Sequence, residues 1–158
     1  MNIQFQSAVI FVKDIQMSRK FYEELLEQTV IIDHGPNVGF EGFALWEAQH
    51  ANLVIGNHAT PEPLGQNNME FYFESPELDA VLEQFNETKT PFVHDIHEQP
   101  WGQRVLRVFD PDGHIVEVGE PMPVVILRFA SQGLSVVEIA ERSSMPVEIV
   151  KQIIDSTG

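Results

Sequence analysis

Two glutamates, Glu70 and Glu117, stand where carboxylates are uncommon in a folded chain. Glu117 lies in the short apolar run at residues 115–118, which follows turn-forming residues 110–113 and is typical of the second strand of a β-hairpin. Successive side chains of a strand point to opposite faces, so Glu117 is expected among apolar neighbours on a strand covered on both sides. A carboxylate in such surroundings is costly unless it has a partner, a proton or a task.

An internal repeat relates these glutamates to the first half of the chain. At a constant offset of 63 residues, and without a gap, glycine, apolar and acidic positions coincide over roughly fifty residues of each half. The same offset aligns Glu70 with Ser7 and Glu117 with Val54. We therefore expect two copies of one module, of which only the second carries acids at both positions.

Two inward carboxylates in one pocket support two interpretations. In the first, Glu70 and Glu117 share a proton or a cation and the pKa of one is raised, which suits a catalytic base beside a carbonyl group or a cradle for a basic ligand. In the second, the acids are remnants that water or an arginine such as Arg104 or Arg107 neutralises. We favour the first and include Arg104 among the candidate ligand-binding residues.

Each module is predicted to be β-α-β-β-β. In the first, residues 8–12 favour a strand, residues 14–26 a helix with Asp14 as its N-cap, and residues 40–47 and 51–55 a strand pair.

The polar residues 57–68 contain two prolines and a glycine, which is typical of a linker. After it, residues 69–74 and 91–96 favour strands, Ser75 caps the intervening helix, and residues 101–118 form the hairpin. The predicted modules therefore span residues 3–56 and 69–119.

Composition narrows the class of protein. The chain has 158 residues, a formal charge of −15 and no cysteine, so a disulfide framework and thiol chemistry are excluded. The acidic balance disfavours nucleic acid and anionic membranes as partners. We find no apolar run long enough for a membrane helix and no basic segment before the first apolar residues. A cytoplasmic protein is predicted.

The chain resembles the glyoxalase, bleomycin-resistance and extradiol-dioxygenase superfamily, also called vicinal oxygen chelate proteins. The resemblance covers residues 3–120 and rests on the paired modules, on the Asp-Pro-Asp-Gly-His turn at residues 110–114 with the strand after it, and on Phe21-Tyr22 in the first helix. It implies an α+β fold, with two modules forming a cupped mixed sheet around a small-molecule site, and a homodimer.

Members that bind a divalent metal carry His, Gln or Glu at inward positions of the first and last strands. On this chain the resemblance maps those positions to Ser7, Val54, Glu70 and Glu117, with Asn52 as an alternative to Val54 if the register is shifted. Ser is a poor ligand and Val is none, so Glu70 and Glu117 would form a weak oxygen site. The cofactor is therefore expected to be none, or a weakly bound divalent metal ion.

Residues 121–158 lie outside the resemblance and predict three helices with a helix-turn-helix-like arrangement. This segment holds three basic residues against four acidic ones, so binding to nucleic acid is not expected. We expect the helices to pack on the cup or on a partner subunit.

The function predicted is that of a divergent glyoxalase or bleomycin-resistance-like protein. It would bind a small organic molecule in the cup, with Ser7, Asn52, Trp101 and Arg104 as ligand-binding residues and Trp101 as a wall for a flat ligand. If it is an enzyme, Glu70 or Glu117 is the base of a lyase or isomerase acting on a carbonyl compound. The alternative is a ligand-responsive regulatory or interaction module acting through the helical tail. An extradiol dioxygenase ranks lower.

Overall fold

The computed structural model describes residues 3–56 and 63–156, so residues 57–62 of the predicted linker lie outside the described residues. The chain forms two compact units, one of residues 1–69 with 109–115 and one of residues 70–108 with 116–158. Strands form two four-stranded mixed sheets, and helices follow at the C-terminus. The predicted α+β fold with two strand-rich modules and a C-terminal helical region is therefore confirmed.

The first sheet has the order β1-β4-β3-β2. Its strands are β1 (Ala8–Val12), β2 (Ile32–Asp33), β3 (Asn37–Gly39) and β4 (Phe43–Glu47). β1 runs parallel to β4, and the other neighbours are antiparallel. Ile10 and Val12 of β1 are buried because alternate side chains of the strand face the core.

The first helix begins where the sequence predicts. Asp14 accepts hydrogen bonds from the backbone N–H groups of Gln16 and Met17, and α1 (Ile15–Arg19) continues into the π-helix η1 (Lys20–Leu25). Tyr22 is fully buried, with its ring 5.4 Å from that of Phe43 on β4. Aromatic packing therefore fixes this helix against the first sheet.

The predicted strand at residues 51–55 is wrong, because these residues belong mainly to the helix α2 (Ala48–Val54). Ala48 and Ala51 lie one turn apart on its buried side, while Leu53 is exposed. The apolar run is too short for periodicity to separate strand from helix. The sequence also missed the short strands β2 and β3.

Without a strand at residues 51–55, the predicted repeat with a constant offset of 63 residues is also wrong. β1 and β5 are neighbours of β4 and β8 in their respective sheets. The first residues of β1 and β5, Ala8 and Glu70, are 62 positions apart in the sequence. The first residues of β4 and β8, Phe43 and Ile115, are 72 positions apart, so the offset is not constant. The counterpart of Glu117, at the centre of β8, is therefore the buried Leu45 at the centre of β4 and not Val54.

The second sheet has the order β5-β8-β7-β6. Its elements are β5 (Glu70–Glu74), α3 (Leu78–Glu87), β6 (Phe92–Glu98), β7 (Arg104–Phe109) and β8 (Ile115–Gly119). On β7, Arg104, Leu106 and Val108 point to the same face of the sheet, because side chains alternate along a strand. Arg104 bonds to Asp79 in the first turn of α3, so α3 covers this face. The opposite face carries Glu70, Tyr72, Arg107 and Glu117, and we call it the acid face.

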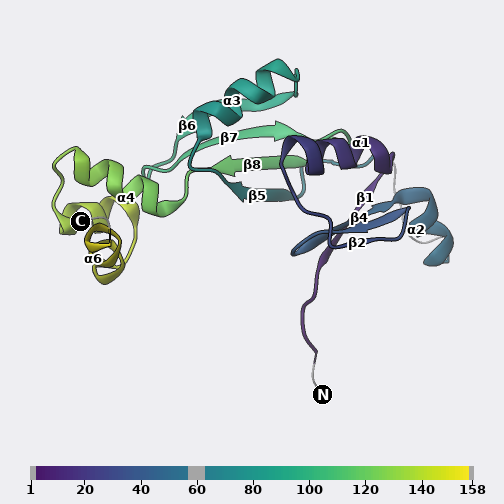
Figure 1. Cartoon of the computed structure of the whole chain (residues 1–158), viewed down its shortest axis with the longest axis horizontal. Coiled ribbons are helices and arrows are strands. Elements are labelled where there is room, and N and C mark those ends of the chain that lie inside the picture. The colour runs from purple at the N-terminus through teal and green to yellow at the C-terminus, as the bar shows by residue number, and fades with distance from the viewer. Residues whose placement is uncertain (1–2, 57–62, 157–158) are drawn as a thin grey trace. The chain divides into compact units, whose positions relative to one another are not determined.

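Three helices follow the second sheet and gather at one end of it (Figure 1). They are α4 (Met122–Ser131), α5 (Val136–Ser143) and α6 (Val147–Asp155). Ser135 and Glu138 form a capping box at the start of α5. The helices share a buried core that includes Ile126, Phe129 and Ile139.

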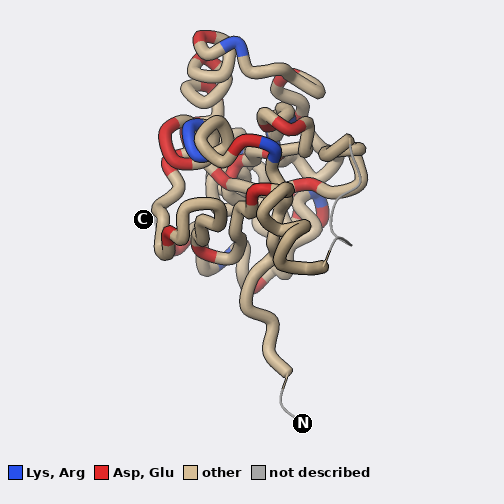
Figure 2. The backbone as a smooth tube through the Cα atoms, turned by 90° about the vertical axis from the view of Figure 1, so that its right-hand side faces the viewer, with Lys and Arg blue, Asp and Glu red and all other residues tan. Residues whose placement is uncertain are grey.

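Acidic positions outnumber basic ones along the backbone (Figure 2), as expected for 24 acidic and 9 basic residues. Among the helices of the described residues, none has the length and apolar character needed to cross a membrane.

Candidate functional site

One arginine lies between the two glutamates that the sequence singled out. Arg107 Nε donates a hydrogen bond to Glu70 Oε2 at 2.6 Å, and Arg107 Nη2 forms an ion pair with Glu117 Oε2. The side chain of Glu117 is only 9% exposed, whereas that of Glu70 is 37% exposed. β8 lies between β5 and β7, and this order brings the three side chains together on the acid face.

His94 of β6 completes the cluster. Its Nε2 lies 3.0 Å from Arg107 Nη1, and its Nδ1 lies 2.7 Å from the carbonyl oxygen of Asp95. A carbonyl oxygen only accepts, so we assign the ring proton to Nδ1, and Nε2 then accepts from the guanidinium. In this geometry His94 is a neutral acceptor that helps to orient Arg107.

A bulge in β6 sets the position of His94. Its pairing with β7 changes register between His94 and His97, and the two rings lie 6.2 Å apart. Sequence spacing alone does not show such a register change.

The sequence named Arg107, together with Arg104, as an arginine that could neutralise the two acids, and the structure places Arg107 between them. Like Glu117, Arg107 is a charged residue in an apolar strand, between Leu106 and Val108.

The surroundings of Glu117 make its carboxylate more basic than that of an ordinary glutamate. Burial raises the pKa of Glu117, Arg107 opposes that rise, and the charge of Glu70 adds to it. The raised pKa means that Glu117 holds a proton at a higher pH than an ordinary glutamate. It is therefore suited to exchanging protons nearer neutral pH.

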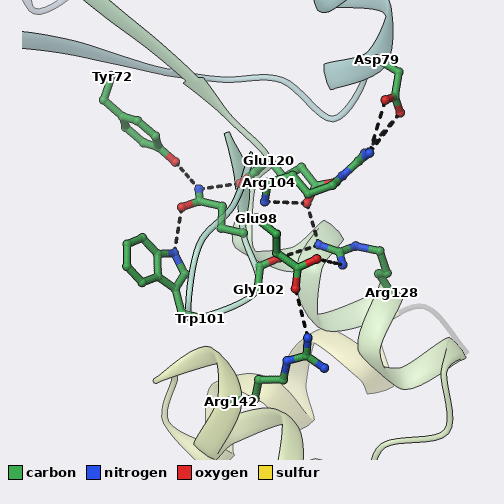
Figure 3. Close-up of polar contacts among 10 residues, drawn as sticks. Tyr72, Asp79, Glu98, Trp101, Gly102, Arg104, Glu120, Arg128 and Arg142 are labelled. Atoms are coloured by element: carbon green, nitrogen blue, oxygen red, sulfur yellow. Dashed lines mark hydrogen bonds and ion pairs between the residues drawn. The ribbon is translucent and has the colours of Figure 1, made fainter. Parts of the chain in front are cut away.

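Two exposed aromatic residues, Tyr72 of the acid face and Trp101, are joined through hydrogen bonds to Gln103. Figure 3 shows how Tyr72 and Trp101 lie. Trp101 Nε1 donates to Gln103 Oε1 at 3.0 Å, and Gln103 Nε2 donates to the Tyr72 hydroxyl at 2.7 Å and to the Glu120 carbonyl oxygen at 2.8 Å. Tyr72 in turn donates to Glu74 at 2.8 Å. Burial and this bond to Glu74 raise the pKa of Tyr72 to about 12, so its hydroxyl stays protonated at neutral pH.

Gly119 leaves room for this arrangement. A Cβ atom there would lie 2.9 Å from Gln103 Nε2 and 3.2 Å from the Tyr72 ring. Trp101, which the sequence proposed as a wall, is 39% exposed, and Tyr72 is 50% exposed.

The other predicted ligand-binding residues lie elsewhere. Arg104 is on the face covered by α3, where it pairs with Glu120 at 2.7 Å and with Asp79 at 3.3 Å. Ser7 is exposed before β1, and its hydroxyl donates to the Ala8 carbonyl oxygen. Asn52 is on α2, so the strand register that suggested it does not exist. The second unit brings Glu70, Glu117 and Trp101 to the acid face, and Arg104 is not on that face.

The family model described as "Glyoxalase-like domain" matches residues 5–123. A solved structure, a protein of unknown function from Agrobacterium tumefaciens, is 37% identical, with a TM-score of 0.69 over 77% of this chain and 96% of that one. The chain belongs to the glyoxalase-like family.

Other glyoxalase-like structures show the same fold at lower identity. A lactoylglutathione lyase from Agrobacterium tumefaciens is 23% identical, with a TM-score of 0.59 over 77% of this chain and 96% of that one. A fosfomycin resistance protein from Listeria monocytogenes is 16% identical, with a TM-score of 0.57 over 77% of this chain and 95% of that one. A search of curated proteins gives no match.

The divalent metal of many glyoxalase-like proteins does not fit the donors present here. Among the described residues, no group of three or more His, Cys, Asp or Glu side chains is placed to hold a metal ion. The two candidate ligands, Glu70 and Glu117, already pair with the guanidinium of Arg107. A cation between them would have to displace an arginine that is hydrogen-bonded to Glu70 and His94 and ion-paired with Glu117.

Proposed function

We propose that this glyoxalase-like protein binds a small carbonyl compound on the acid face and exchanges a proton next to its carbonyl group, without a divalent metal. The observation that carries the proposal is the position of Arg107 between Glu70 and Glu117. A fixed positive charge thus lies beside a carboxylate whose pKa is raised.

Arg107 can hold the carbonyl oxygen of such a ligand. A guanidinium has five N–H donors: among the described residues, one bonds to Glu70 and one to His94, and the Nη2 group is ion-paired with Glu117. Two donors stay available for a ligand oxygen, and the side chain is 25% exposed. A negative charge that develops on that oxygen would be stabilised by the guanidinium.

Glu117 supplies the base. It takes the proton from the carbon next to the carbonyl group, and the electron pair of the broken C–H bond moves toward the oxygen, giving an enolate paired with Arg107. The carboxyl group of Glu117 exchanges its proton with solvent, and a solvent proton returned to the same carbon gives exchange. If that carbon carries a hydroxyl group, the intermediate is an enediolate: transfer of the hydroxyl proton to the other oxygen and return of the carbon-bound proton to the former carbonyl carbon give isomerisation. Glu70 keeps Arg107 oriented.

Hydrogen exchange into hydroxyacetone tests the proposal. Hydroxyacetone in D₂O with EDTA is followed by NMR, and we expect protein-dependent deuterium incorporation beside the carbonyl group. Glu117→Gln should lower that rate about 100-fold or more, because the base is lost.

Glu74→Gln is the matched control. Glu74 lies on β5 like Glu70, but it accepts a hydrogen bond from Tyr72, whereas Glu70 accepts one from Arg107. The Glu74→Gln variant should keep most of the rate. Exchange that appears only when a divalent metal is added, or that is equal in the Glu117→Gln variant, contradicts the proposal.

A further inference from the structure

The C-terminal helices lie almost entirely outside the matched glyoxalase-like residues, yet they contact one particular loop. Residues 99–103 connect β6 to β7 and carry Trp101, so this loop supplies one aromatic residue beside the acid face. α4 contacts the middle of this loop, and α4 and α5 both contact Glu98, the residue just before it.

Arg128 of α4 holds the middle of the loop. Its Nη2 donates to the Gly102 carbonyl oxygen at 2.6 Å and to Glu120 Oε2 at 2.8 Å (Figure 3). Phe129, the next residue on α4, packs directly against Gly102, where a Cβ atom would lie 2.0 Å from the ring atom Cζ. Gly102 has φ +86°, a conformation that favours glycine.

Glu98, the last residue of β6, holds the start of the loop. It pairs with Arg142 of α5 at 3.0 Å and with Arg128 at 3.7 Å. Arg142 also lies 4.2 Å from the centre of the Phe129 ring.

The charges of this network balance. Three of the nine basic residues of the chain, Arg104, Arg128 and Arg142, face the acids Asp79, Glu98 and Glu120. Because basic residues are scarce in this acidic chain, placing a third of them around one loop indicates that the position of the loop is specified by side-chain contacts.

We propose that α4, supported by α5, acts as a positioning element for the aromatic side of the acid face: α4 fixes the 99–103 loop, and with it Trp101, through Arg128 and Phe129, while Arg142 of α5 contacts Glu98 and the Phe129 ring. Through Gln103 the same network reaches Tyr72. The importance of Trp101 for a ligand rests on the proposed function, but the fixing of Trp101 by the helices does not.

Trp101 fluorescence tests this proposal without any ligand. The chain has two tryptophans, so Trp46→Phe leaves Trp101 as the only one. In that background Arg128→Met removes the hydrogen bonds but keeps an unbranched apolar side chain. The rate constant for quenching by acrylamide should rise about two-fold or more, because the loop is released.

Two controls separate positioning from general loss of structure. Lys151→Met, the same kind of change on the exposed side of α6, should leave Trp101 quenching unchanged. In a Trp101→Phe background, Arg128→Met should leave Trp46 quenching unchanged, whereas a general loosening would raise it.

Equal Trp101 quenching with and without Arg128, in protein that folds by circular dichroism, would overturn the proposal. If Arg128→Met does not fold, Arg142→Met decides by the same measurement, because Arg142 is 45% exposed and its removal is milder. If Arg128→Met raises the quenching of Trp101 but the protein does not catalyse hydroxyacetone exchange, the positioning role is supported and only the proposed function is contradicted.

Discussion

At the scale of single residues, the central feature is a guanidinium shared by two carboxylates. Taking away one partner of a part-buried ion pair leaves the other charges unsatisfied, which costs more than the pair itself contributes. Arg107 is thus expected to matter for stability as well as for binding.

Arg107→Met should lower the free energy of unfolding by about 2 kcal/mol at pH 7, because Glu117 is left buried without its positive partner. The loss should shrink toward pH 5, since Glu117 can then take up a proton and its pKa is already raised. Urea unfolding at the two pH values measures both effects.

Arg19→Met is the control for the loss of an arginine whose acidic partners are less buried than Glu117. The acids that pair with Arg19, Glu23 and Asp33, are 28% and 44% exposed, so the replacement of Arg19 should cost less than about 1 kcal/mol. That cost should not change between pH 7 and pH 5, because the pKa of Asp33 is lowered and its carboxylate stays ionised over this range. An equal cost for both variants would show that the acid pair does not depend on Arg107.

The pH profile of hydroxyacetone exchange follows from Glu117. The base must be ionised to accept a proton, so the rate should rise with pH and level off above the raised pKa of Glu117. The midpoint should lie above the value of an ordinary glutamate. A profile that is flat from pH 4 to pH 8 would assign the exchange to another group.

At the scale of secondary-structure elements, the junction between the sheet and α4 rests on a glycine and a buried glutamate. Gly102→Ala should destabilise the fold by about 3 kcal/mol, because the methyl group meets Phe129 and the backbone is held at φ +86°. Thermal or urea unfolding measures the change.

Gly133→Ala separates the two contributions to that cost. Gly133 has the same φ of +86°, but a Cβ atom there meets nothing within 4 Å. Gly133→Ala should lower the free energy of unfolding by only about 1 kcal/mol, because the left-handed conformation is unfavourable for alanine. Equal losses at both glycines would mean that Phe129 does not pack closely on Gly102.

Glu120→Gln tests the ion network of the same junction. The side chain of Glu120 is 1% exposed between Arg104 and Arg128, and although burial acts to raise its pKa, the hydrogen bonds from these arginines lower it overall. A lowered pKa in the folded state gives stability that is present above the unfolded pKa and is lost as the pH falls through the folded pKa.

The cost of Glu120→Gln should therefore be about 3 kcal/mol at pH 7 and diminish as the pH falls below the ordinary range of glutamate, as measured by urea unfolding. Glu98→Gln is the control, since its carboxylate is 42% exposed, and it should cost less than about 1 kcal/mol. A Glu120 variant with a pH-independent cost would contradict the charge pairing.

At the scale of the whole molecule, the sequence predicts best where local chemistry decides the structure. The turn at residues 110–113 specifies the β7-β8 hairpin, and the capping residues Asp14 and Ser135 mark helix starts that the structure confirms. These signals act over a few residues, so they need no knowledge of distant contacts.

Features that depend on packing between distant residues were not predicted from the sequence. α2 has no side-chain cap and is held by the burial of two alanines, so its short apolar run looked like a strand. Glu117 stood out in the sequence by its apolar neighbours, and Glu70 by its place in the internal repeat. That Arg107 and not Arg104 pairs with these acids depends on the strand order of the second sheet, and the contact of His94 with Arg107 depends on the register shifts of β6.

Titration of the Glu117 carboxyl group is the most direct test of the account. Glutamate labelled with ¹³C at the side-chain carboxyl is followed by NMR in EDTA, with Glu117→Gln to assign the signal. We expect the pKa of Glu117 to lie above that of an ordinary glutamate and to rise further in the Arg107→Met variant, because the opposing positive charge is gone. A Glu117 that titrates like a solvent-exposed glutamate, and does so with or without Arg107, would contradict the account.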